Sequence, residues 1–274
     1  YNNLNGDGTS GYDMYDNGGG KITATNVIHR SSSSVTFSGT NSTSNPLFAD
    51  ASSNDYTLQS TSPAIGAGNT DATATDFNGI TRPQGTNDDI GAYEYRNTWT
   101  GSSSTDWGTT GNWDQSYEPN ANTESPIIAD VTNQPVISSD DGSSNDGNVL
   151  LEDITINSGA ELTINKDASL KLVGDFTNNS GTVTLNSDSS EFASIIVQGS
   201  SSGNIIYNRY VNSLTGGSGW DLVGSPVDGL SISSFANTND SPLATGGGGS
   251  DNQYAIGYYD NSADDWTNYT TATI

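Results

Sequence analysis

Residues 154–172 read ITINSGAELTINKDASLKL, and an apolar–polar–apolar triplet recurs in them every eight residues. Such alternation is typical of a strand that buries one face. The segments between triplets are rich in Asn, Ser, Gly and Asp, the residues that turns favour. We therefore expect short strands whose apolar positions point inward and stack in continuous ladders: Ile154, Ile156, Leu162, Ile164, Leu170, Leu172, Val183 and Leu185.

The same pattern extends over residues 149–212, where apolar pairs recur about every 8–10 residues. Regular short strands separated by Asn/Gly turns indicate either a small β-solenoid or a β-sandwich. The constant triplet spacing favours the solenoid, because each coil of a solenoid repeats the same inward stripe. Further strand-like runs lie at residues 22–28 and 34–37. We therefore expect an all-β protein.

The composition is polar and acidic. Apolar residues make up 31% of the chain, below the ~45–50% of ordinary globular domains, but a solenoid coil needs only a narrow apolar stripe. The net charge of −25 excludes nucleic acid and anionic membranes as partners, and reflects either a well-solvated surface or divalent cation binding. There is no cysteine, so disulfides and thiolate metal sites are excluded. No apolar run approaches the ~18–20 residues of a membrane span, so we expect no membrane insertion.

Residues 46–95 contain six short motifs in order: PLFAD (46–50), DYTL (55–58), SPAIGAG (62–68), DFNG (76–79), RPQG (82–85) and DIGAYEY (89–95). This segment, called the closing block below, resembles the C-terminal end of the right-handed parallel β-helix of large secreted bacterial proteins. The resemblance implies that residues 1–95 are the last coils and the closing block of such a helix. The chain would then begin inside a solenoid. Within the block, we expect Arg82 to form a structural salt bridge with an aspartate.

Residues 96–148 form a Trp-rich junction with Trp99, Trp107 and Trp113. The pattern resembles the opening of a module common in secreted proteins of the Bacteroidota. Two interpretations are open. The indoles lie exposed and stack on sugar rings, which would make all three carbohydrate-binding residues, or they are buried together as the cap of the next solenoid. The cap is favoured because tryptophan is usually mostly buried.

Residues 213–274 are expected to be the start of a β-sandwich-like module that is cut short. Residues 219–227, GWDLVGSPV, are similar to a motif that follows solenoids in the same secreted proteins. The first residue is Tyr1 and the sequence stops abruptly at Ile274. We interpret the chain as an internal segment of a longer exported protein.

Two oxygen-rich loops are candidate calcium sites. Residues 3–8 match the first half of an EF-hand loop, but the position of the bidentate glutamate is Met14. Residues 140–147 read DDGSSNDG and form the second loop. Ordinary turns use the same residue types, so turn chemistry is the simpler interpretation. The candidate ligands are Asn3, Asn5, Asp7, Asp140, Asp141 and Asp146.

Catalytic residues are not expected. His29 is the sole histidine and cannot anchor a multi-histidine zinc site. No Gly-x-Ser-x-Gly nucleophile elbow occurs. Asp88 and Asp89 are adjacent, and neighbouring side chains of a strand point to opposite faces, so the pair is not poised for acid–base chemistry.

The resemblance implies a secreted or outer-membrane-surface protein of a Gram-negative bacterium, handled by the type IX secretion machinery during export. We expect a non-catalytic stalk or adhesin segment that attaches to a surface or polysaccharide. The alternative is an accessory region of a polysaccharide lyase or glycoside hydrolase whose active coils precede residue 1. Calcium is the one cofactor that the residues suggest.

Overall fold

The computed structural model describes residues 14–15, 22–25, 32–33, 35–38, 44–68, 74–139, 147–210, 231–237, 245–246 and 253–270. The described part of the chain is mostly β, with 34% strand and 6% helix, and it contains several parallel sheets. The chain divides into two compact units, residues 1–212 and 213–274.

The N-terminal strands form two parallel pairs. β1 (Met14–Tyr15) pairs with β3 (Ser32–Ser33). β2 (Ile22–Thr25) pairs in parallel with β4 (Val35–Ser38). Strands therefore occur in both N-terminal runs where the sequence predicts them.

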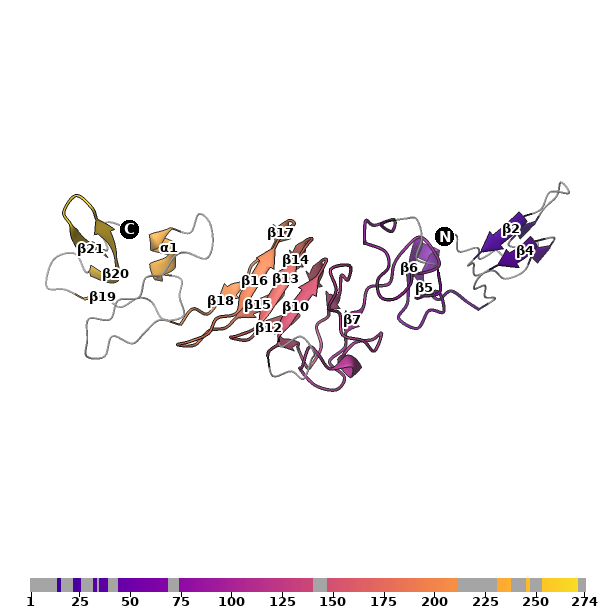
Figure 1. Ribbon diagram of the computed structural model, residues 1–274, viewed down its shortest axis with the longest axis horizontal. Coiled ribbons are helices and arrows are strands. Elements are labelled where there is room, and N and C mark those ends of the chain that lie inside the picture. Colours follow the sequence, from indigo (N-terminus) through magenta and orange to yellow (C-terminus); the bar gives the residue numbers. More distant parts are fainter. Residues whose placement is uncertain are drawn as a thin grey trace. The chain divides into compact units, whose positions relative to one another are not determined.

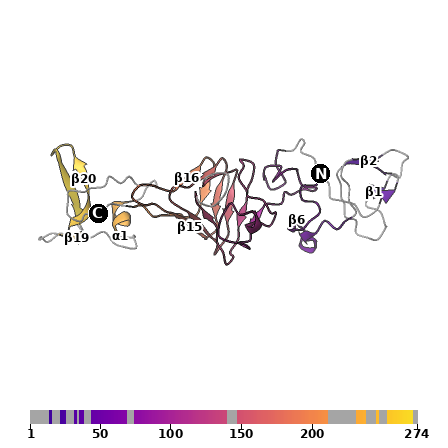
Figure 2. The ribbon, with the colours of Figure 1, turned by 60° about the horizontal axis from the view of Figure 1, so that its bottom comes forward.

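Residues 98–207, called the three-sheet unit, consist of short strands in three parallel sheets (Figures 1 and 2). The strand orders are β10-β13-β16, β17-β14-β11-β8-β7 and β18-β15-β12-β9. From β10 onward, consecutive strands enter different sheets, and each strand pairs with the one three places further along the chain. The strands are β7 (Thr98–Trp99), β8 (Ile127–Ile128), β9 (Val136–Ile137), β10 (Asn148–Leu151), β11 (Ile154–Ile156), β12 (Glu161–Ile164), β13 (Ser169–Leu172), β14 (Phe176–Asn178), β15 (Thr182–Leu185), β16 (Ser194–Val197), β17 (Ser201–Ser202) and β18 (Ile206–Tyr207).

The interior of the three-sheet unit is filled by the apolar ladders that the triplets predict. All eight inward positions are buried, with at most 4% of their surface exposed. Leu162 pairs with Val183 and Ile164 with Leu185, so successive strands place aliphatic side chains directly on one another. Each such side chain contributes about 1.5–3 kcal/mol through burial. The ladder prediction is confirmed.

Turn residues at the corners stack in the same way. The Asn186 side chain donates to Asn165 Oδ1 at 3.3 Å, and the Asn208 side chain donates to Asn186 Oδ1 at 3.1 Å. At another corner, Asp153 Oδ1 accepts the backbone N–H of Asp175 at 2.6 Å. The polar residues that the sequence places between triplets therefore make turns and also connect one layer of strands to the next.

The closing block has little regular structure. β5 (Phe48–Asp50), the 3₁₀ turn η1 (Ala51–Ser53) and β6 (Asp55–Leu58) form an antiparallel hairpin. A small apolar cluster contains Leu58, Ala64 and Ile90. The other described residues of the block are loop, so their backbone polar groups need partners outside regular strands.

In the second unit, β20 (Gln253–Asp260) pairs antiparallel with β21 (Asp265–Thr270) and with β19 (Thr245–Gly246). One short helix, α1 (Ile232–Asn237), precedes these strands. Among the described residues, no helix has the length and apolar character needed to cross a membrane.

Candidate functional site: a buried carboxylate network around Arg82

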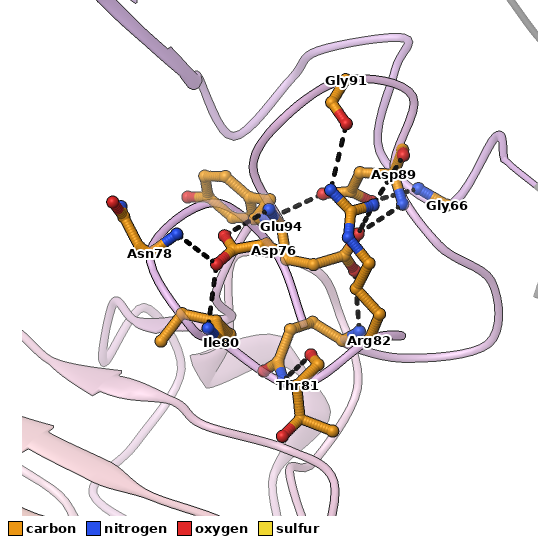
Figure 3. Close-up of polar contacts among 11 residues, drawn as sticks. Gly66, Asp76, Asn78, Ile80, Thr81, Arg82, Asp89, Gly91 and Glu94 are labelled. Atoms are coloured by element: carbon orange, nitrogen blue, oxygen red, sulfur yellow. Dashed lines mark hydrogen bonds and ion pairs between the residues drawn. The ribbon is translucent and has the colours of Figure 1, made fainter. Parts of the chain in front are cut away.

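Arg82 is the centre of a buried ionic cluster in the closing block (Figure 3). Its Nη1 donates to Glu94 Oε1 at 2.6 Å and to the Asp89 carbonyl at 3.2 Å, and its Nη2 donates to the Gly91 carbonyl at 3.0 Å. The side chains of Arg82 and Glu94 are 4% and 0% exposed. The expected salt bridge exists, and the partner that the described residues give it is a glutamate, Glu94.

Both oxygens of Glu94 are used. Oε1 accepts from Arg82 and from the backbone N–H of Asp89 at 2.8 Å, and Oε2 accepts from the backbone N–H of Gln84 at 2.9 Å. Burial raises the pKa of Glu94, against the opposing effect of these backbone donors and of Arg82. The carboxylate thus connects the RPQG motif to the DIGAYEY motif.

Arg82 contacts the main-chain carbonyl of Asp89, whereas the side chain of Asp89 has other partners. Its Oδ1 accepts the backbone N–H of Gly66 at 2.7 Å, and its Oδ2 accepts the N–H of Tyr95 at 2.5 Å. The carboxylate is therefore aimed at the loop backbone. Burial, and then the neighbouring charge of Glu94, raise the pKa of Asp89 to about 7 despite those two donors.

Asp76 binds the backbone of the loop that contains the DFNG motif. Its Oδ1 accepts the backbone N–H groups of Asn78 at 2.7 Å and Ile80 at 2.8 Å, and its Oδ2 accepts the N–H of Glu94 at 3.0 Å. The DFNG motif is thus a turn whose first residue caps its own backbone, as aspartate commonly does.

The SPAIGAG motif contributes a close backbone contact. The N–H of Gly68 donates to the carbonyl of Asp88 at 2.7 Å. A Cβ on Gly68 would lie 2.7 Å from the same carbonyl oxygen, closer than real Cβ atoms approach. A side chain would not fit at residue 68, so packing requires glycine at this position of the SPAIGAG motif.

The contacts of this cluster hold the loops of the closing block in place. Asp76, Asp89 and Glu94 all accept hydrogen bonds from loop backbone N–H groups, and Arg82 neutralises only part of the negative charge. In such buried sites the partners of each charge fix the loop conformation, and removal of any one leaves the others unpaired. Asp88 and Asp89, expected on opposite faces, are both buried.

The structure describes none of the candidate calcium ligands. Asn3, Asn5 and Asp7, as well as Asp140, Asp141 and Asp146, lie outside the described residues, as does His29. Within the described ranges, no group of three or more His, Cys, Asp or Glu side chains is arranged to hold a metal ion.

The three tryptophans of the junction are buried in the core of the three-sheet unit. Trp99 and Trp107 are 0% exposed and Trp113 is 2% exposed. Trp113 packs edge-on against both other rings, at centroid distances of 5.1 and 4.7 Å. Each indole N–H donates to a backbone carbonyl. The sugar-stacking interpretation is therefore wrong, because no ring face is open to a ligand. The rings are buried together, as the alternative expects, and their role as the cap of a solenoid stays a prediction.

The tryptophans share one core with the repeats, although the sequence suggests a separate junction. They belong to the same buried cluster as the aliphatic ladders. β7 and β8 extend the sheet of β11 and β14, and β9 extends the sheet of β12. The 3₁₀ turn η2 (Thr110–Asn112) ends at Trp113, which forms an isolated antiparallel bridge with Trp99 of β7.

Sequence reasoning missed Gln84, in the closing block, and Arg96, directly after it, which both contact the three-sheet unit. The Gln84 side chain accepts from the Ser125 N–H and donates to the Thr123 carbonyl. Arg96 donates to the carbonyls of Ser125 and Pro126. A signal was available for Arg96, because the chain has only 7 Lys and Arg against 32 Asp and Glu, so each cation is a candidate partner for a specific group.

Comparison with known families places most of the chain in one of them. Residues 98–269 match the model of a family described as a domain of unknown function, DUF8693. The match begins at the first strand of the three-sheet unit and covers more than half of the chain, so the chain belongs to this family. No curated protein and no solved structure matches the chain.

Proposed function

We propose that this chain is a non-catalytic structural or adhesive segment, a stalk or adhesin, of a large secreted or cell-surface bacterial protein. In this proposal residues 1–95 end a right-handed parallel β-helix, residues 149–212 are a second small β-solenoid, and residues 213–274 begin a β-sandwich. One observation carries the proposal. From β10 onward, each strand pairs in parallel with the strand three places further along the chain, and the sheets enclose a filled aliphatic interior. Such stacking suits an extended scaffold whose layers contact only their neighbours.

The state of the ionisable groups supports a structural role over a catalytic one. A lyase or glycosidase needs carboxylates or a base within reach of its substrate. Here Arg82, Glu94 and Asp89 are buried and hydrogen-bonded to the loops of the closing block. If the alternative role as an accessory region of a polysaccharide-degrading enzyme holds, the reacting groups belong to coils before residue 1.

The proposed cellular location and export route rest on the sequence resemblances. Motifs similar to those of secreted Bacteroidota proteins favour an outer-membrane-surface or extracellular location and export through the type IX machinery. A chain without cysteine and with a net charge of −25 suits a soluble exported surface that repels anionic polymers. The proposed ligand is accordingly a surface or polysaccharide, bound without chemical change.

The test is to incubate the purified chain with a panel of neutral and anionic polysaccharides. We expect retention on one or more polymers, with no new reducing ends and no absorbance from unsaturated products. The side chains of Phe77 and Trp266 are 78% and 50% exposed. We expect substitution of either residue by alanine to weaken retention on the polymer. Trp113→Phe is the buried control. Turnover that a single Asp or Arg substitution abolishes in a folded protein would sink the structural role.

Calcium binding by the loops at residues 3–7 and 140–146 is proposed with its own test. A ligand that binds only the folded state raises the melting temperature by mass action. We expect a chelator to lower the melting temperature and excess calcium to restore it, with magnesium as the control ion. A melting curve that responds to neither addition would leave both loops as ordinary turns.

A further inference from the structure

A line of buried polar contacts runs from Arg82 into the first layer of the three-sheet unit. Glu94 bonds Arg82 through one oxygen and the backbone N–H of Gln84 through the other. The Gln84 side-chain oxygen then accepts the N–H of Ser125 at 2.8 Å, and its amide nitrogen donates to the carbonyl of Thr123 at 2.7 Å. Gln84 is 6% exposed and Ser125 is 0% exposed.

Ser125 is also bound by a second side chain, that of Arg96. Arg96 donates through Nε to the Ser125 carbonyl and through Nη2 to the Pro126 carbonyl at 3.2 Å. The same Nη2 donates to Thr155 Oγ1 on β11 at 2.8 Å. Gln84 therefore binds the N–H of Ser125 while Arg96 binds its C=O. Both main-chain groups of one buried residue are held by side chains from outside the three-sheet unit.

These contacts bear on how the two modules move. Neighbouring modules in a chain are expected to move independently unless their interface resists it. Here, moving Gln84 and the adjoining Arg96 away from the three-sheet unit would strip partners from a buried backbone N–H, from a buried carbonyl and from the Arg96 guanidinium. Buried polar groups without partners are costly.

We infer that Gln84 and Arg96 form a clasp on Ser125 that makes the closing block and the three-sheet unit one cooperative folding unit, with a stiff junction in place of a hinge. The inference goes beyond the proposed function, because it concerns how the modules are joined and holds whether or not the chain binds a surface.

The test is native-state hydrogen exchange on the whole 274-residue chain, read on peptides from residues 46–95 and 149–185. Leu162→Ala, a substitution inside the three-sheet unit, supplies the perturbation. With the clasp intact, we expect it to speed exchange of the most protected amides in both segments by the same factor, roughly tenfold or more. In a Gln84→Ala background, it should speed exchange only in residues 149–185.

Two further variants keep the outcome interpretable. Gln59→Ala removes a side-chain amide bond to the Phe48 carbonyl inside the closing block, so it should leave the two segments coupled. Arg96→Lys keeps the charge but loses the paired contacts, and it should uncouple them if Gln84→Ala fails to fold. If Leu162→Ala leaves residues 46–95 unaffected in the otherwise unmodified chain, the modules are independent and the inference is overturned.

Discussion

The three-sheet unit and the closing block are adjoining parts of one chain, but different interactions hold them together. In the three-sheet unit, aliphatic side chains repeat at the same inward position in layer after layer, and main-chain groups pair along parallel strands. Among its described residues, the closing block has a small apolar cluster of Leu58, Ala64 and Ile90, and it relies on buried carboxylates that bind loop N–H groups. A repeating backbone satisfies its own hydrogen bonds, whereas an irregular one needs charged side chains to do so.

The largest effect is expected in the ladders. Leu162→Asp places an unpaired carboxylate against Val183 in a fully buried position. Burial of an unpaired charge costs several kcal/mol, and we expect the three-sheet unit to unfold, as read by circular dichroism and protease resistance. Lys171→Asp introduces the same group at an exposed position of β13 and should leave both signals unchanged. Native signals from Leu162→Asp would contradict the ladder assignment.

The next largest effect should appear in the closing block. Glu94→Gln keeps the size of the side chain but removes the charge opposite Arg82. It also replaces one acceptor oxygen by an NH₂ group, which then faces a hydrogen-bond donor. Loss of one partner of a buried ion pair costs about 3–5 kcal/mol, which thermal or urea unfolding would report. Glu161→Gln, at an exposed position on β12, is the control and should behave like the unmodified protein. Equal melting temperatures for the two variants would mean that the network contributes little.

The contrast between the two regions also explains what could be predicted from the sequence. The positions of the inward residues from Ile154 to Leu185 follow from period-2 alternation and a constant spacing, so their burial was predictable. The partner of Arg82 was not, because Glu94 lies twelve residues away in a loop whose path depends on the contacts themselves. The clasp between Gln84 and Ser125 spans 41 residues without any periodic signal. For the tryptophans, residue type predicted burial, but nothing local indicated that they share a core with the repeats.

A smaller effect is expected from pH, through Asp89. Its folded-state pKa of about 7 lies above the ordinary aspartate value of 3.8, so between these pH values the folded protein holds a proton that the unfolded chain has released. The unfolding free energy must therefore fall as pH rises through this window. Because one pKa unit corresponds to about 1.4 kcal/mol, we expect a loss on the order of a few kcal/mol between pH 4 and 8.

Melting temperatures measured across that range would test this sign. Self-repulsion of a chain with net charge −25 also grows with pH, so the slope alone does not identify the group. Asp89→Asn removes the titrating carboxyl and should flatten the profile, while Asp188→Asn, at an exposed carboxyl, should not. A profile that keeps its full slope in Asp89→Asn would assign the pH dependence to other carboxylates.

The smallest effect should come from the exposed ion pairs on the three-sheet unit. Lys166 lies 2.6 Å from Asp188 and 3.3 Å from Glu191, but the three side chains are 47%, 37% and 46% exposed. Water and salt screen such charges, so exposed pairs add little to stability. We expect Lys166→Met to change the melting temperature only slightly, and molar salt to remove the difference. Lys171→Met controls for the added apolar surface. The loss in Glu94→Gln should persist at the same salt concentration, because the Arg82–Glu94 pair is shielded from solvent. If salt abolished both effects equally, the buried network would be as well solvated as the surface pair, and the distinction between the two regions would fail.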